Sequence, residues 1–129
     1  MKKPPLNTCG CGPCSLARTG DFLPHTKQVL TEMMWHRGGD FFMRCGGVLT
    51  VDQLHAFLVE GLVPAADRLA RANIEETAVA NFKTAATRLA RERAEHMLDV
   101  NEEAGTFVRL GPRYFMTEVG RTMLKEATA

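Results

Sequence analysis

The stretch RLGPRYFMTEVGRTML, which covers Arg109–Leu124, decides the fold of the C-terminal part of the chain. Residues with high β propensity lie on both sides of Gly111-Pro112, over about 106–110 and 114–117. A Gly-Pro pair between two such runs is a turn signal. The sequence therefore predicts a β-hairpin in this region.

The residues after the hairpin predict a short closing helix over about 118–127. Thr117 can cap this helix, and Glu118 then lies in its first turn, where the helix dipole favours a carboxylate. Gly120 has no side chain, so it lets the backbones of the hairpin and the helix approach each other closely.

The regions before the hairpin have the apolar spacing of helices. Two of them begin with capping-box spacing, Thr50 with Gln53 and Asn73 with Glu76. Gly38 supplies a C-terminal stop for the first helix. We expect helices over about 25–37, from Thr50 to Gly61, over 64–71 and over 74–98, with a short extended segment and a Gly-Gly break over 40–49.

The longest of these regions, 74–98, predicts a helix roughly 35 Å long. That length suits a scaffold, a dimer contact or a helix that reads a DNA groove. Its expected apolar stripe is Ile74, Ala78, Phe82, Ala85, Leu89 and Met97, with Ala86 and Ala90 beside it.

Composition places the chain among ordinary globular proteins. Its 129 residues are 45% hydrophobic, which suffices for a core in one domain. We expect a mostly helical α+β fold, with an irregular Cys-rich segment over 1–24 and a single domain over 25–129. No apolar run approaches the roughly 20 residues that span a bilayer, and no apolar stretch follows the first lysines. A cytoplasmic protein without membrane contact is therefore expected.

The region of about 82–124 resembles the wing and final helix of MarR-like and PadR-like winged-helix regulators. In those families an aromatic-rich strand ends in a Thr-Glu-x-Gly stretch before the closing helix. The matching residues here are Tyr114, Phe115, Thr117, Glu118 and Gly120. The resemblance implies a transcriptional regulator that binds double-stranded DNA, with a recognition helix in the major groove and a wing against the backbone or minor groove. A homodimer is also expected of such a protein.

The basic residues of this region are compatible with DNA binding, although the net charge of the chain is only +1. Each of them could neutralise one phosphate and add to the salt dependence of binding. The candidate DNA-binding residues are Lys83, Arg88, Arg91 and Arg93 on the long helix, and Arg109 and Arg113 beside the hairpin turn.

Two other interpretations remain open. Arg and Glu alternate over 91–95, which is also typical of a solvated helix face with ion pairs. The same fold also serves as a protein–protein interaction module, for example in an accessory or inhibitory protein, and the low net charge favours this alternative. An enzyme is not expected, because the sequence lacks a convergent nucleophile or acid–base set.

A cysteine cluster near the N-terminus predicts a metal site. Cys9, Cys11 and Cys14 lie within six residues, and the glycines and proline between them allow a tight turn around one ion. Cys45 is the first candidate for the fourth ligand of a structural zinc ion, followed by His25 and His36.

The same cysteines allow three alternatives to zinc. Four thiolates can hold an iron–sulfur cluster. Cys11-Gly-Pro-Cys14 has the spelling of the thioredoxin dithiol, but no strand is expected before it. The third alternative is a cluster of cysteines that binds no metal or forms disulfides.

Overall fold

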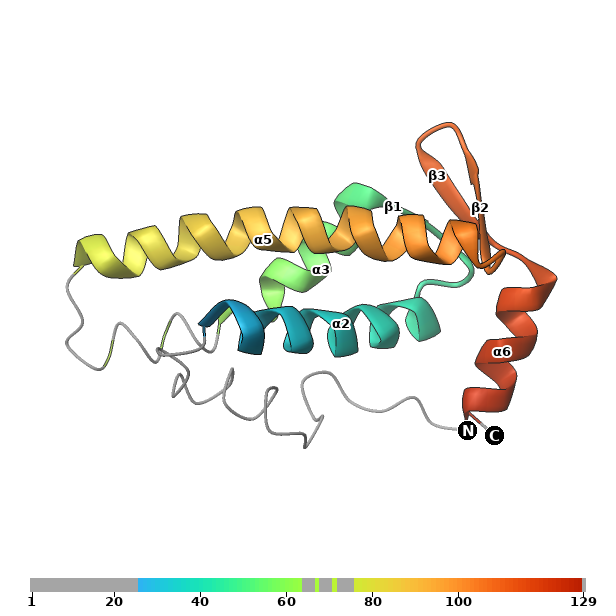
Figure 1. Ribbon diagram of the computed structural model, residues 1–129, viewed down its shortest axis with the longest axis horizontal. Helices are drawn as coiled ribbons and strands as arrows, with labels where there is room; N and C mark the ends of the chain where they lie inside the picture. Colours follow the sequence, from blue (N-terminus) through green and yellow to red (C-terminus); the bar gives the residue numbers. More distant parts are fainter. Residues whose placement is uncertain (1–25, 64–66, 68–70, 72–75, 129) are drawn as a thin grey trace.

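The computed structural model describes residues 26–63, 67, 71 and 76–128 (Figure 1). This part of the chain has a mostly helical α+β fold, which confirms the expected class. Its helices are α2 (Thr26–Arg44), α3 (Val51–Glu60), α5 (Glu76–Glu103) and α6 (Glu118–Thr128), and its strands are β1 (Val48–Thr50), β2 (Phe107–Leu110) and β3 (Arg113–Met116).

Helices α2, α3 and α5 pack against one another. Figure 1 shows α5 as the longest rod, with α2 beside it and α3 running in the opposite direction. The β2–β3 hairpin projects from one end of this group, with its turn directed away from the helices, and α6 leads off in another direction. The hairpin and α6 therefore both project from this end of the described part.

The three strands form an antiparallel sheet in the order β1-β3-β2. Strand β1 comes from the segment between α2 and α3, yet it pairs with β3, with Leu49 opposite Tyr114. Strand β2 pairs with the other edge of β3, with Phe107 opposite Met116. The hairpin is thus anchored to the helices through β1.

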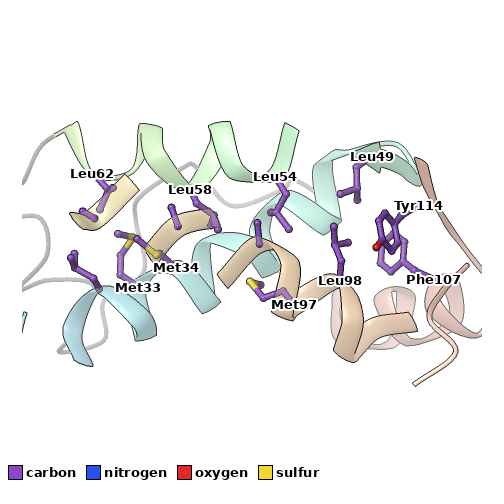
Figure 2. Packing of buried hydrophobic residues seen from close by; sticks show 14 of the residues in the cluster. Met33, Met34, Leu49, Leu54, Leu58, Leu62, Met97, Leu98, Phe107 and Tyr114 are labelled. Carbon is purple, nitrogen blue, oxygen red and sulfur yellow. The ribbon is translucent and has the colours of Figure 1, made fainter. Parts of the chain in front are cut away.

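The core lies between the three helices and one face of the sheet. Figure 2 shows Leu98 of α5 close to Leu49, Phe107 and Tyr114 of the sheet. Farther along, side chains of α2, α3 and α5 continue the same cluster, and its largest fully buried members are Leu30, Met34, Leu49, Leu54, Leu58 and Leu98.

The expected apolar stripe of the long helix was wrong at Ala78 and Ala85, but Met97, Ala86 and Ala90 are buried as expected. Ala78 and Ala85 are exposed, and the buried seam passes through Ala86, Ala90 and Ala94. Alanines in this seam keep the surface of α5 narrow where α2 and α3 approach it, so the larger side chains of those helices fill the space. Ile74, the first expected member, lies outside the described residues.

The expected stop of the first helix at Gly38 was also wrong, since α2 continues to Arg44. A Cβ atom at Gly38 would overlap the side chain of Met97. This glycine therefore serves a close contact between α2 and α5. The chain turns at Gly46 and Gly47, which have φ angles of 75° and 88°. The expected extended segment over 40–49 is helical up to residue 44 and forms a strand only from residue 48.

Several other boundaries were predicted correctly. Thr50 and Gln53 form the capping box, with backbone-to-side-chain distances of 2.9 and 3.1 Å, and Gly61 follows the end of α3. The hairpin and the closing helix lie where they were expected. Helix α5 extends past its expected end near residue 98, to Glu103. Asn73 and most of the expected helix over 64–71 lie outside the described residues.

Within the described ranges, the helices are all too short or too polar to cross a bilayer.

Candidate nucleic-acid interface

The base of the hairpin is fastened to the start of α6 by Thr117. Its backbone N–H donates to the carbonyl of Thr106 at 2.9 Å, and its hydroxyl donates to the carbonyl of Gly105. The same hydroxyl accepts a hydrogen bond from the N–H of Gly120 at 3.2 Å, which confirms the expected cap. A Cβ atom at Gly120 would overlap the carbonyl oxygen of Thr106, which confirms the expected close approach.

The tip of the hairpin is a two-residue turn. Leu110 pairs with Arg113, and Gly111 between them has a φ of 63°, the sign that a type II′ turn requires at its first central position. Arg109 and Arg113 are both exposed. The Nε of Arg109 donates to the carbonyl of Gly111 at 3.2 Å, and its guanidinium lies 6.0 Å from the centre of the Tyr114 ring. The side chain of Arg109 therefore stabilises the turn from one face of the hairpin.

The hairpin carries positive charge only. Residues 104–117 contain two arginines and no carboxylate side chain. Arg121, on α6, lies beside Gly47 and adds a third guanidinium near the base of the sheet. This end of the described fold can therefore approach an anionic surface without repulsion from acids of the hairpin itself.

A cleft of about 450 Å³ separates the hairpin from α5 and the start of α3. It is lined by three carboxylates, Asp52, Glu95 and Asp99, and by the guanidiniums of Arg91 and Arg109. The charges of this cleft nearly cancel, with an excess of acid. A phosphate group entering it would meet as much repulsion as attraction.

Arg91 is held inside this cleft by two ion pairs. Its guanidinium donates to Asp52 of α3, and its Nε donates to Glu95 on the next turn of α5 at 3.0 Å. These bonds, with the bond to Asp52 the larger cause, raise the pKa of Arg91 above its ordinary value. Two carboxylates thus neutralise Arg91 locally and connect α3 to α5.

The other basic residues of α5 do not share one face with Arg91. At about 100° per residue, Arg88 lies about 60° from Arg91 around the helix, but Arg93 lies about 160° away. Arg93 is half-buried, and its Nε is buried without a hydrogen-bond partner in the described part of the chain. Lys83 and Arg88 are exposed on the first half of the helix. Arg109 and Arg113 both lie beside the hairpin turn but on opposite faces of the hairpin, and of the four helix residues only Arg91 lines a cleft with Arg109.

Of the four predicted cysteine ligands, only Cys45 belongs to the described residues; of the two alternative ligands, His36 lies on α2 and His25 lies outside the described residues. Cys45 is half-buried directly after α2, and its thiol lies 3.5 Å from the carbonyl of Phe42. Cys9, Cys11 and Cys14 lie outside the described residues, so the zinc site stays a prediction. Among the residues that the structure describes, His, Cys, Asp and Glu side chains do not gather in groups that could hold a metal ion.

Sequence reasoning missed two features of this end of the molecule. The first is Asp52, which lies on a different helix from Arg91, so that only the folded chain brings the pair together. The second is the outer face of the sheet, where Val48, Phe115 and Val108 form one cross-strand row. Their alternation with buried residues in each strand was a signal of this face, because neighbouring strand residues point to opposite sides.

Comparison with known proteins found no match for this chain among family models, curated proteins or solved structures.

Proposed function

We propose that this protein is a regulator that binds double-stranded DNA and that the β2–β3 hairpin makes the principal contact. The order of elements supports this proposal. A strand between the first two described helices pairs with the second strand of the hairpin, and the hairpin directly follows the longest helix. The succession of helices, hairpin and closing helix is the order that the resemblance to winged-helix regulators implies.

The observation that carries the proposal is the charge and position of the hairpin. It projects from the helices, exposes Arg109 and Arg113, and contains no acid (Figure 1). Each exposed guanidinium can neutralise a phosphate and release a counterion, which is the main source of affinity in sequence-independent DNA binding. The near-zero net charge of the whole chain does not oppose this, because a local surface makes the contact.

In this proposal α5 does not act as the helix that reads a DNA groove. Glu95 and Asp99 line the cleft between α5 and the hairpin, and Glu92 is exposed one turn earlier. DNA pressed into that cleft would bring phosphates next to these carboxylates. We therefore assign the principal contacts to the hairpin.

The salt dependence of DNA binding tests this assignment. We expect the protein to bind mixed duplex DNA at about 50 mM salt and Arg113→Ala to lower the slope of log K against log salt by about 1. Arg91→Ala is the matched control, because Arg91 is already neutralised by Asp52 and Glu95. It should leave the slope unchanged.

Two outcomes would contradict the proposal. The first is no binding of any duplex pool at about 50 mM salt, where phosphate contacts are strong. The second is a loss of slope in Arg91→Ala as large as in Arg113→Ala, which would place DNA in the cleft and not on the hairpin.

A protein–protein interaction module is the second candidate, and one observation favours it. Val119 and Met123 lie one helical turn apart on α6 and are 54% and 56% exposed, so this short helix presents an apolar stripe. Such a stripe fits a partner protein or a second copy of the chain. A stable dimer or a stoichiometric protein complex, together with absent DNA binding, would favour this candidate.

A further inference from the structure

The tip of the hairpin combines an exposed apolar side chain with two guanidiniums. Leu110 is 62% exposed, which is the largest exposure among the big apolar side chains of the described residues. It lies next to the turn residues Gly111 and Pro112 and directly opposite Arg113. A single exposed leucine is ordinary on a protein surface. The position of Leu110 at the end of a projecting basic hairpin indicates that it contacts a ligand.

The register of the sheet fixes the direction of these side chains. Leu110 and Arg113 point to the outer face of the hairpin, together with the row that contains Val108. Arg109 and Tyr114 point to the opposite face, where Tyr114 is buried against the core. The outer face of the tip therefore carries Leu110 beside Arg113, whereas Arg109 and Pro112 line the cleft on the opposite face.

The tip is held in place before any ligand arrives. Tyr114 belongs to the central strand and is only 4% exposed, so the base of the hairpin is fixed in the core. Arg109 joins this base to the turn through its bond to the carbonyl of Gly111. A preformed tip loses little conformational freedom on binding, which favours insertion into a narrow site.

The DNA minor groove is a site that suits this tip. It is about 6 Å wide, which admits a tight turn but excludes a helix. Its negative potential is strongest where the groove is narrow, and arginine side chains are attracted there. Leucine and proline are among the side chains that proteins insert between base pairs from the minor groove to unstack and kink the duplex.

We propose that Leu110 enters the minor groove as an apolar wedge, guided by Arg113 beside it on the outer face, and that binding bends the DNA. This inference rests on the proposed function. The wedge unstacks one base step, so the protein prefers sites with a flexible TA or CA/TG step, which unstack most easily. Sequence preference then comes from the deformability of the duplex, because the hairpin does not read base edges.

The test uses the whole protein and a duplex with 2-aminopurine beside a central TA step, since the fluorescence of this base rises when it unstacks. We expect the wild-type protein to raise the fluorescence and to bend the duplex. Leu110→Ser should abolish both responses and weaken binding by less than about tenfold, because the arginine–phosphate contacts remain. Leu110→Phe should retain the responses, because an aromatic side chain is also an effective wedge.

Val108→Ser is the matched control, since Val108 lies on the same face of β2 and is 44% exposed but is farther from the turn. It should bind, unstack and bend the duplex as the wild-type protein does. Circular dichroism and thermal melting of each variant establish that the hairpin is folded.

The results separate the two proposals. Binding without unstacking, or equal unstacking by wild-type protein and Leu110→Ser, overturns the wedge and leaves the proposed function intact. Absent binding to any duplex overturns the proposed function and the wedge with it. Binding of the tip to vesicles of anionic lipid, with no response from any duplex, also overturns both.

Discussion

At the residue scale, Gly120 is a position where an added methyl group would meet backbone atoms. Its Cβ would meet the carbonyl oxygen of Thr106 and the side chain of Met116, and the carbonyl cannot move without breaking its bond from Thr117. We expect Gly120→Ala to lower the free energy of unfolding by about 1–3 kcal/mol, as overpacking does elsewhere. Urea unfolding followed by circular dichroism measures this change.

Gly39 is the control for that substitution, because it lies in helix α2 and a methyl group added there would meet no other atom within 4 Å. Gly39→Ala should raise the stability by about 0.5–1 kcal/mol, since alanine loses less backbone entropy in a helix. Equal effects of the two substitutions would show that Gly120 does not make the close contact described above.

Sequence reasoning served well where a residue acts on its own neighbours in the chain. The caps at Thr50 and Thr117 and the turn at Gly111 depend on residues only a few positions apart, so their chemistry is visible in the sequence. The prediction of a helix stop at Gly38 used the same local logic and was wrong. The actual role of Gly38 depends on Met97, which the sequence does not place beside it.

At the scale of elements, Arg37 connects α2 to the end of α3. Its side chain is buried, its Nε donates to the carbonyl of Phe57 at 2.6 Å, and its guanidinium lies 4.1 Å from the centre of the Phe57 ring. Burial lowers the pKa of Arg37, while Glu60 and Asp40 act in the opposite direction. A cation near the last carbonyls of a helix is favoured by the helix dipole.

We expect Arg37→Met to destabilise the protein by about 2–3 kcal/mol, because it removes a charged hydrogen bond from a buried site. Arg44→Met is the matched control on the same helix. The Nε and one terminal nitrogen of Arg44 are buried without a hydrogen-bond partner in the described part of the chain. Its replacement should change the stability by less than about 1 kcal/mol, or raise it, because a buried unpaired polar group costs free energy. Chemical denaturation of both variants decides between these roles.

The extent of each element was less predictable than its presence. The hairpin and α6 were found because turn chemistry and a cap delimit them. Helix α5 continues past residue 98 because Asn101 bonds back to Met97 and to Thr106, contacts that stabilise its last turns. The positions of Arg109 and Arg113 beside the hairpin turn could be predicted, because the turn residues lie between them in the sequence. The ion pair that neutralises Arg91 could not be predicted, because it depends on packing between two helices.

At the scale of the whole molecule, the proposed zinc site would join the segment 1–24 to the end of α2. We expect protein purified without chelator to contain about one equivalent of zinc and to lose thermal stability when the metal is removed, because metal binding contributes to the free energy of folding. Cys45→Ala should lower the zinc content, and His96→Ala, the control at an exposed histidine of α5, should leave it unchanged. Less than about half an equivalent in the wild-type protein would count against the site.

The strand order β1-β3-β2 also has a consequence for how this chain folds. Strand β1 leaves the ribosome well before its partner β3 has been synthesised, so Leu49 has no Tyr114 to pack against during that interval. The β2–β3 hairpin closes over a two-residue turn, whereas the pairing of β1 with β3 and the packing of α2 on α5 both need a long loop to close. We therefore expect the hairpin to form early and the pairing of β1 with β3 to come late, so that the proposed ligand-binding part of the fold is shaped before it is anchored to the helices.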